Sequence, residues 1–429
     1  MRPDPRRARP DARKARPLKA RPPAPVRPAT PGAGRVVLRR GRDHRARAGH
    51  LWIYAGEIER ILGDPEPGSA VQVVDTRGEF LGGGYYNPAS NIAVRLVTRE
   101  PDEVYGPGLL RRRIEAALAY RSSLGLGGDV LRLVSSDGDH LPGLTVDRYG
   151  DQLVMQIGTL GIDRLRGPIT EILVDLVGPR GIFERSDLPA RSHEGLGSVT
   201  GVLHGDVPDS LEVEVDGLRQ EASIRSGQKT GLFLDHRPNR LALRSLAPGR
   251  RVLDVFCNTG GFALSALLGG AREAVGIDSS AEALAAAARN AARNGLEQRV
   301  RFVEGNAFDR LKEMDRRGER FDLIVLDPPA FTKNRDSVDA ARRGYKEINL
   351  RALRMAAQGG VVVSASCSYH IGPESFLDIL VDAAADAGRE VTLLSYGSQG
   401  PDHPVNLAMP ETRYLKCAFL AVRDAPPAP

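Results

Sequence analysis

Apolar residues in the second half of the chain fall into short continuous runs that alternate with longer amphipathic stretches. Four of these runs are RVLDVF at 251–256, AVGID at 274–278, FDLIVLD at 321–327 and GGVVVSAS at 359–366. Near-continuous apolar runs of this length are typical of strands that are buried on both faces. Because helical stretches separate them, the pattern predicts an α/β domain with a parallel, doubly wound, Rossmann-like sheet.

One of the intervening helices has clear boundaries in the stretch SSAEALAAAARNAARNGL at 279–296. Ser279 or Ser280 can cap its start, because a hydroxyl oxygen accepts a hydrogen bond from a free backbone N–H group of the first turn. Asn294 and Gly295 can end it, since both residue types tolerate the left-handed conformation that closes many helices.

The first half of the chain has a different pattern. Short β-branched runs at 35–40, 70–75 and 91–98 are separated by Gly, Pro and Asp, which predicts a small all-β module over residues 35–108. Residues 50–61, between the first two runs, are expected to form a short helical or turn insert.

A middle domain of the α+β class is expected over residues 109–215. It begins with apolar residues at helical spacing over 109–126, which predict a connecting helix. Five strand-like runs and one helical stretch at 167–178 follow, without a catalytic constellation. The α/β domain then covers residues 216–429.

Residues 1–34 form a tail of Arg, Pro and Ala without apolar periodicity, and we expect it to be disordered. The tail holds ten Lys or Arg and two Asp or Glu, so the net charge of +6 leaves the other 395 residues at −2. The tail is either a polycation that adds salt-dependent affinity for phosphates or an extension without a selected role. Any phosphate-binding surface on the folded part must be a local patch.

Several protein classes are excluded or disfavoured by composition. No stretch approaches the roughly 20 apolar residues that a membrane span needs, and no apolar run follows the charged N-terminus as in a secretory signal. The three cysteines, Cys257, Cys367 and Cys417, are odd in number and lack metal-ligand spacing such as CxxC. We therefore expect a cytoplasmic protein with free thiols, no membrane partner and no metal site.

Polar residues and glycines follow the predicted strands of the α/β domain. Gly260 and Gly261 follow the first run, Asp278 ends the second, and Asn306 follows the run at 301–304. Asp327 and Cys367 end the last two. Ligands of doubly wound sheets bind outside the carboxyl ends of the strands, so these residues predict one site. Asp278 suits ribose hydroxyls, and the amide of Asn306 suits an adenine edge.

A dinucleotide is the first ligand to consider, because glycines followed by an acidic residue also describe NAD sites. The loop CNTGGF at 257–262 lacks GxGxxG and so lacks the third glycine of a pyrophosphate cradle. A ligand with adenosine but without phosphates fits better, and S-adenosylmethionine is such a ligand.

The segment Asp327-Pro328-Pro329-Ala330-Phe331 has the chemistry to hold a flipped base. The prolines fix the backbone so that carbonyls and the Asp327 side chain face the pocket, and Phe331 offers a stacking face. A rigid turn after a buried strand would explain the prolines but not a carboxylate at the edge of the cofactor site.

Taken together, VLDVFCNTGGFAL, GID, LDPPAFTKN and SCSYHI, with GQKTGLFLDHRPNR upstream, resemble the class I 23S ribosomal RNA large-subunit methyltransferases that modify carbon 5 of cytosine. LPGLTVDRYGD and ERSD resemble the middle domain of that family, and the all-β module is similar to its N-terminal, RNA-binding PUA domain. The resemblance covers roughly residues 35–423.

The resemblance implies roles for particular residues. Phe233 would cover the cofactor pocket, with Asp235 and Arg237 as buttresses, and Cys367 would be the nucleophile. Asn306 stands where such proteins often have Asp, and Cys257 lies where the family tolerates Cys without a catalytic role. The cofactor and base pocket would be lined by Asp254, Asn258, Thr259, Gly260, Gly261, Asp278, Asn306 and Asp327.

Carbon 5 of cytosine is a poor nucleophile, so the implied reaction needs covalent activation. We expect Cys367 to add to carbon 6 while Asp327 binds the N3 and amino edge of the base. Most free cysteines are buried small hydrophobes, but Cys367 lies between Ser366 and Ser368, one step past a strand. His370 could activate the thiol, although a loop histidine facing solvent is the simpler interpretation.

Two other functions remain open. A methyltransferase acting on an exocyclic amine of an RNA base would use Asp327-Pro328-Pro329 in the same way, but would not need Cys367. A non-catalytic RNA-binding or ribosome assembly protein would not need the intact set of acidic and glycine residues at the strand ends.

The expected partner is ribosomal RNA, 23S by the resemblance. Lys229, Lys333, Arg335, Arg342 and Arg343 are candidate phosphate contacts, or solvated surface charges. The sequence leaves the oligomeric state open, with a homodimer as one option.

Overall fold

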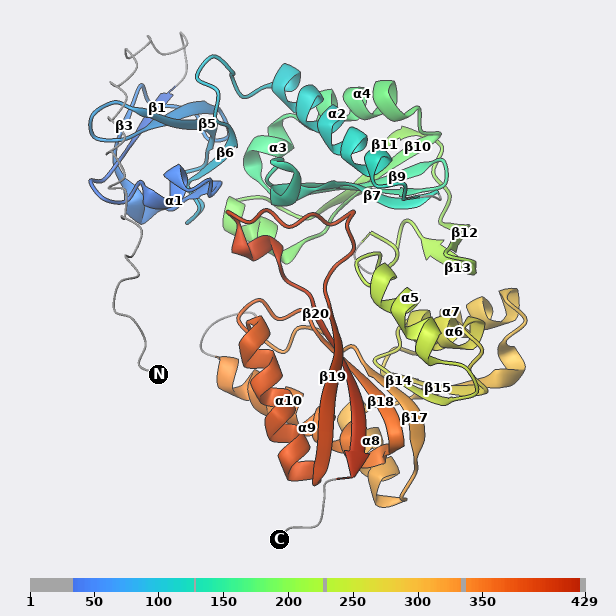
Figure 1. The fold of residues 1–429 in the computed structure, drawn as a ribbon. Coiled ribbons are helices and arrows are strands. Elements are labelled where there is room, and N and C mark those ends of the chain that lie inside the picture. Colours follow the sequence, from blue (N-terminus) through green and yellow to red (C-terminus); the bar gives the residue numbers. More distant parts are fainter. Residues whose placement is uncertain (1–33, 127–128, 227–229, 333–336, 425–429) are drawn as a thin grey trace, which may run out of the picture.

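The computed structural model describes residues 34–424 apart from 127–128, 227–229 and 333–336. The expected tail (except Gly34) and the candidate phosphate contacts Lys229, Lys333 and Arg335 lie outside the described residues. Three sheets of five or more strands follow one another along the chain, with a small two-stranded sheet between the second and the third (Figure 1).

The first sheet has six strands in the order β2-β6-β5-β4-β1-β3 and forms the expected all-β module. Strands β1 and β4 are parallel, and the other neighbours are antiparallel. Its elements are β1 (Gly34–Leu38), α1 (His44–Arg47), β2 (Trp52–Ile53), β3 (Ile58–Leu62), β4 (Ala70–Val74), β5 (Phe80–Tyr86) and β6 (Val94–Thr98).

The expectation of a helical or turn insert at 50–61 is wrong for most of its length. Residues 55–57 form a single 3-10 turn, but β2 and β3 lie on either side of it as the two edge strands of the sheet. Ile58 and Ile61 are three residues apart, which is not the simple alternation of a strand, but a register shift in the pairing of β3 with β1 lets both isoleucines pack against the core of this module.

The middle domain has a five-stranded sheet in the order β11-β10-β9-β8-β7, which confirms an α+β unit. The expected connecting helix is α2 (Pro107–Ser123), and α4 (Arg166–Val177) matches the helical stretch at 167–178. Both helices pack on one face of the sheet. The remaining elements are β7 (Val130–Ser135), β8 (Leu144–Tyr149), β9 (Gln152–Ile157), α3 (Leu160–Arg164), β10 (Gly181–Ser186) and β11 (Val199–Gly205).

A hairpin of β12 (Ser210–Val215) and β13 (Leu218–Ser223) joins the middle domain to the α/β domain. Its apolar residues pack on the middle domain around Tyr149 and Phe183. Its other side contacts a helix of the α/β domain, where the Glu221 N–H donates to the Asn290 side chain at 2.9 Å. The boundary expected at 215/216 therefore falls at the tip of a hairpin that both domains share.

The third sheet has seven strands in the order β16-β15-β14-β17-β18-β20-β19. The first five are parallel, as the sequence pattern predicts, whereas β20 runs antiparallel to both of its neighbours. The strands are β14 (Arg251–Val255), β15 (Glu273–Asp278), β16 (Val300–Glu304), β17 (Phe321–Leu326), β18 (Ala356–Ser366), β19 (Arg389–Gly397) and β20 (Lys416–Asp424).

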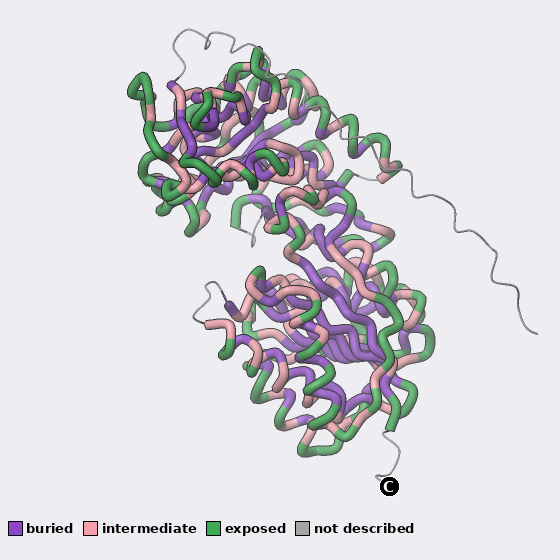
Figure 2. The backbone as a smooth tube through the Cα atoms, turned by 60° about the vertical axis from the view of Figure 1, so that its left-hand side comes forward, coloured by how far each residue is buried: buried purple, intermediate pink, exposed green. Residues whose placement is uncertain are grey.

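Helices cover both faces of this sheet, and successive residues of one strand serve opposite cores. Val252 packs with helices α5 to α7 on one face, and Leu253 packs with α8 to α10 on the other. Figure 2 shows the resulting band of buried strands between partly exposed helices. The helices are α5 (Arg237–Leu246), α6 (Gly261–Leu268), α7 (Ala281–Arg293), α8 (Ala307–Arg316), α9 (Val338–Met355) and α10 (Pro373–Ala387).

The connection between β19 and β20, residues 398–415, reaches back to both preceding domains (Figure 1). Met409 is buried in the core of the first module, where its sulfur accepts a hydrogen bond from the Leu51 N–H at 3.1 Å. The carbonyl of Asp402 accepts a hydrogen bond from the buried Arg121 of α2 at 2.6 Å. This connection ties the three domains together.

Candidate active site

The loop after β14, residues 256–260, leads directly into α6 and has a strained backbone. It is called the cofactor loop below. Phe256 and Asn258 have positive φ angles of 66° and 47°, a conformation that asparagine tolerates but that a bulky side chain such as Phe256 rarely adopts. Gly260 has φ 83°, and a Cβ atom there would lie 3.2 Å from the Phe302 ring. Such strain is concentrated at ligand sites in many proteins, and here it lies at the carboxyl end of the sheet, directly after β14.

Asp254 lies fully buried beneath this loop. Its Oδ2 accepts a hydrogen bond from the Ala263 N–H at 2.8 Å, while Oδ1 has no partner among the described residues. Burial, together with the charges of Asp327 and Asp278, raises the pKa of Asp254 to about 7. A ligand with a positive charge or a donor group would satisfy the free oxygen.

Asp278 ends β15, and both of its carboxylate oxygens are held by backbone donors. Oδ2 accepts from the Asn258 N–H and Oδ1 from the Ser280 N–H, each at 2.9 Å. Each oxygen keeps a second lone pair, so the carboxylate can still bind ribose hydroxyls. The first contact also ties Asp278 to the strained loop.

Asn306 begins α8 as its N-cap, a role that the sequence analysis did not assign to it. Its side-chain oxygen accepts hydrogen bonds from the Phe308 and Asp309 N–H groups at 2.9 and 3.4 Å. The amide NH₂ group is therefore the part of this side chain that could contact an adenine ring.

The remaining cofactor candidates lie around the same loop. Gly261 is the first residue of α6, and the Thr259 carbonyl accepts from the Asn290 side chain at 3.2 Å. Phe233 is half-buried, and its carbonyl accepts from Arg240 at 2.9 Å.

The two expected buttresses, Asp235 and Arg237, contact neighbouring elements of the fold. Asp235 accepts a hydrogen bond from the Tyr414 hydroxyl at 2.8 Å, which anchors the β19–β20 connection. Arg237 binds the hairpin residue Asp216 with its Nη2 at 2.6 Å from Oδ1. Both residues hold neighbouring elements in place.

Asp327 follows β17, beside the cofactor loop, and pairs with a histidine that the sequence analysis did not single out. The Nε2 atom of His236 lies 3.1 Å from Asp327 Oδ1. The Asn239 side-chain amide donates to the Ser398 carbonyl and to His236 Nδ1, both at 3.1 Å. Because Nδ1 accepts, the ring hydrogen is on Nε2, the nitrogen that lies close to Asp327.

Cys367 directly follows β18, and its two serine neighbours are fixed by a buried tyrosine. The Tyr345 hydroxyl lies 3.0 Å from the hydroxyls of both Ser366 and Ser368. Ser368 Oγ also accepts from the Phe331 N–H at 3.1 Å. The segments of Cys367 and Asp327, which are 40 residues apart in the sequence, are thereby joined.

The base-pocket candidates Pro328, Pro329 and Phe331 differ in exposure. Pro328 is buried, Pro329 is exposed, and Phe331 is half-buried. The Phe331 ring centre lies 4.6 Å from that of Tyr345 and 5.8 Å from that of Phe308. Phe331 is thus part of an aromatic cluster, which limits the ring area available to stack on a base.

Lys416 is a second site residue that the sequence analysis missed. It is the first residue of β20 and is buried, with Nζ donating to the carbonyls of Ser368 at 2.8 Å and Tyr414 at 3.0 Å. Burial lowers the pKa of Lys416 to about 8, while the charge of Cys367 acts in the opposite direction. The only sequence signal was a lysine at the start of an apolar run, KCAFLAV.

The other two cysteines are buried. Cys257 belongs to the cofactor loop itself, and Cys417 faces the core of the sheet. Burial raises the pKa of both thiols. Neither has the chemical environment of a nucleophile.

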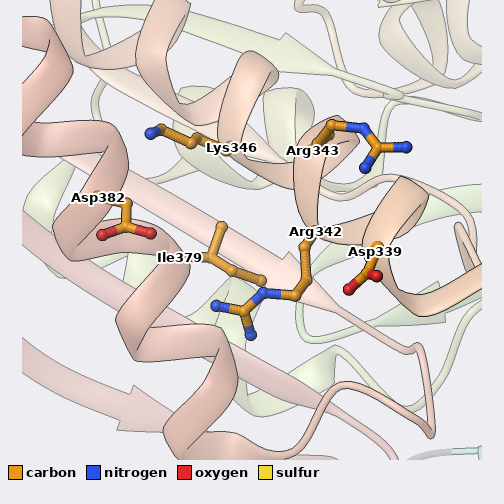
Figure 3. Close-up of a pocket in the computed structure, with 6 residues that line it drawn as sticks. All are labelled: Asp339, Arg342, Arg343, Lys346, Ile379 and Asp382. Atoms are coloured by element: carbon orange, nitrogen blue, oxygen red, sulfur yellow. The ribbon is translucent and has the colours of Figure 1, made fainter.

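A pocket of about 250 Å³ lies between α9 and α10 (Figure 3). The residues that line it come from these two helices and not from the carboxyl ends of the strands. Arg342 and Arg343, two candidate phosphate contacts, line it together with Lys346. Arg342 donates to the Ser375 hydroxyl, and Lys346 pairs with Asp386 at 2.8 Å. Asp339 and Asp382 also line the pocket, so its charge is mixed, with three cations and two carboxylates.

Comparison with known proteins identifies two domain families in the chain. Residues 36–99 match the PUA-like domain family, and residues 193–404 match the S-adenosylmethionine-dependent methyltransferase family. Ribosomal RNA large subunit methyltransferase I from Tolumonas auensis is 40% identical over 386 residues, which are 89% of this chain and 97% of the relative. The protein of the same name from Shigella boydii is 38% identical, over 89% of this chain and 98% of the relative.

The chain belongs to the ribosomal RNA large subunit methyltransferase I family.

Solved structures agree on the fold of the family member described here. A structure from Streptococcus mutans, provisionally described as a SAM-dependent methyltransferase, has a TM-score of 0.78 at 20% identity. It matches 90% of this chain and 99% of its own. A second structure, SMU.776, matches with a TM-score of 0.77 at 19% identity, over the same shares of both chains, and is complexed with SAH. The fold is a class I methyltransferase domain preceded by a PUA-like domain.

S-adenosylmethionine is the cofactor of this methyltransferase, and the residues at the strand ends fit it. The unpartnered Asp254 Oδ1, the oriented Asp278 carboxylate and the strained loop provide polar contacts without a phosphate cradle. Among the described residues, no cluster of His, Cys, Asp or Glu could hold a metal ion. No described helix is long and apolar enough to cross a membrane.

Proposed function

We propose that this methyltransferase modifies carbon 5 of a cytosine in large-subunit ribosomal RNA through a covalent adduct with Cys367. The observation that carries the proposal is the connection of Cys367 to the Asp327 segment by the Phe331 to Ser368 hydrogen bond. Cys367 and Asp327, the nucleophile and the base-binding carboxylate of this proposal, follow the neighbouring strands β18 and β17. The names of the relatives supply the ribosomal RNA as substrate.

In the proposed reaction, the Cys367 thiolate adds to carbon 6 of the extruded cytosine, and the electron pair of the 5,6 double bond moves toward the N3 edge. Asp327, oriented by His236, binds that edge together with the amino group. S-adenosylmethionine supplies the methyl group. Carbon 5 accepts it, a base then removes the carbon 5 proton, and the thiolate leaves as the double bond forms again.

We further propose that nine residues bind the cofactor, with Asp327 shared between the cofactor and the base. Pro328, Pro329 and Phe331 would shape the base pocket, and the PUA-like domain would bind RNA outside the active site. A homodimer remains a prediction. The proposed cofactor residues are Phe233, Asp254, Asn258, Thr259, Gly260, Gly261, Asp278, Asn306 and Asp327.

The test uses RNA that carries 5-fluorocytidine. Fluorine replaces the hydrogen that a base must remove from carbon 5, so the thiolate cannot be eliminated and the adduct persists. With S-adenosylmethionine present, the native protein should form a covalent protein–RNA adduct that Cys367→Ala abolishes. Cys417→Ala, which changes a buried thiol facing the core, should still form it. The absence of any adduct with the native protein would contradict the proposal.

A second candidate function is methylation of an exocyclic amine. Asp327 followed by two prolines would hold an amino group equally well, and no cysteine would be needed. In that case Cys367→Ala would retain methyl transfer to unmodified RNA, and no adduct would form. A non-catalytic protein would transfer no methyl groups at all, whether or not it bound the cofactor in a titration.

A further inference from the structure

Lys416 is a buried cation beside the proposed nucleophile, and the reaction described above gives it no role. In the antiparallel pairing of β18 and β20, Lys416 lies opposite Ser366, the residue before Cys367. Only 2% of Lys416 is exposed. Its position is therefore fixed by the sheet on one side and by the turn after β18 on the other.

The hydrogen-bond partners of Lys416 are neutral. Nζ donates to the carbonyls of Ser368 and Tyr414, and no ion pair joins it to a carboxylate within the described part of the chain. An ammonium group has three N–H donors, and these carbonyls account for two. Burying an ammonium without a compensating anion is costly, so a counter-charge is expected nearby.

The titratable groups around Cys367 come from four segments. Lys416 begins β20, Tyr345 lies on α9, Asp327 follows β17, and Arg413 lies in the connection before β20. The charges of Cys367 and Lys416 act on one another, and Arg413 opposes the charge on Lys416. Burial raises the pKa of Tyr345, and the Cys367 charge adds to that effect, so its hydroxyl remains a neutral donor.

We propose that Lys416 is a positioning residue that holds Cys367 as a thiolate, with its third N–H group directed at the sulfur. The thiol loses its proton to solvent, and the ammonium keeps its three hydrogens. The pair then has no net charge, which reduces the cost of burying both groups. The proposal rests on the proposed function only in assigning the thiolate to cytosine addition.

The test measures the reactivity of Cys367 without RNA. The full-length protein is alkylated with iodoacetamide between about pH 5.5 and 9.5, and the Cys367 peptide is quantified by mass spectrometry. The midpoint of the rate against pH should lie below about 8.5, the ordinary value for a cysteine. Lys416→Met should raise this midpoint by about one pH unit or more, because it removes the charge and keeps most of the side-chain length.

Two further variants separate charge from structure. Lys416→Arg keeps the positive charge and should keep the midpoint close to that of the native protein. Lys346→Met removes a partly exposed lysine that pairs with Asp386 on α10, and it should leave the midpoint unchanged.

Either of two results would overturn the proposal. One is an unchanged midpoint in a folded Lys416→Met protein. The other is a midpoint at or above about 8.5 in the native protein. This measurement uses the native protein alone, so it tests the proposal even if Lys416→Met does not fold. A low midpoint that depends on Lys416, combined with no adduct on 5-fluorocytidine RNA, would support this inference and reject the proposed function.

Discussion

His236 Nε2 lies 3.1 Å from Asp327 Oδ1, between a loop before α5 and the end of β17. Nε2 carries the ring hydrogen, because Asn239 donates to the other ring nitrogen of His236 and is itself fixed by the Ser398 carbonyl. Asn239 also connects the pair to the end of β19. The carboxylate that we assign to base binding is thus oriented by residues from three separate segments.

Removing this donor should weaken methyl transfer without abolishing it. His236→Ala should lower kcat/KM by roughly 10- to 100-fold, since losing a close polar contact to a charged group costs about 1.5–3 kcal/mol. His236→Gln provides an amide donor and should recover most of the activity. Exposed His193 is a suitable control, and His193→Ala should behave like the native protein. Equal activity in His236→Ala and the native protein would argue against the positioning role.

Asp254 should make the stability of the cofactor-free protein decrease with rising pH. Burial raises its folded-state pKa from 3.8 to about 7, so between these values the folded protein retains a proton that the unfolded chain has lost. The stabilisation that this proton provides is complete below about pH 4. It is lost as the pH rises through about 7, and the total loss is at most about 4 kcal/mol.

The variant Asp254→Asn should show a smaller loss of unfolding free energy between about pH 5 and 8 than the native protein. Chemical denaturation at several pH values measures the difference. Asp382→Asn, at an exposed position on α10, serves as the control and should follow the native curve. Parallel curves for Asp254→Asn and the native protein would contradict the assignment.

Met409 should stabilise the first module although it belongs to the α/β domain in sequence. Met409→Ala leaves a cavity in a closed core and should lower the free energy of unfolding by about 2–4 kcal/mol. Leu407, two residues earlier, is 93% exposed, and Leu407→Ala should change the free energy of unfolding by less than about 0.5 kcal/mol. Denaturant titration of both variants is the measurement, and equal effects would show that the connection does not dock as described.

The cap of α7 allows a comparison between two adjacent serines. Ser280 Oγ accepts a hydrogen bond from the Ala283 N–H at 3.1 Å, so Ser280→Ala should lower the free energy of unfolding by about 1 kcal/mol. Ser279 precedes the cap and is exposed, and its replacement by Ala should have little effect. Thermal unfolding of the two variants measures the difference. A larger loss of stability in Ser279→Ala than in Ser280→Ala would contradict the assignment of the cap to Ser280.

The sequence by itself determined the elements whose periodicity is strong. The parallel strands from β14 to β18 and the limits of α7 were predicted, because buried strands and capped helices leave local patterns of apolar residues, serine and glycine. The order of polar residues after those strands also indicated one site, since parallel strands place their carboxyl ends at one edge. The edge strands β2 and β3 were missed because a short, half-exposed strand resembles a turn.

Only the tertiary structure decided which distant residues support that site. His236 and Lys416 carry no local signal, because a histidine in a loop and a lysine at a strand end are ordinary surface residues in a sequence. They become buried partners of Asp327 and of the Cys367 turn when α5 packs on the sheet and when β20 enters antiparallel beside β18. Met409 is similar, since only the folded connection between β19 and β20 brings it into a core formed more than 300 residues earlier. Contacts of this kind depend on the packing of separate elements, and no periodicity within one segment encodes them.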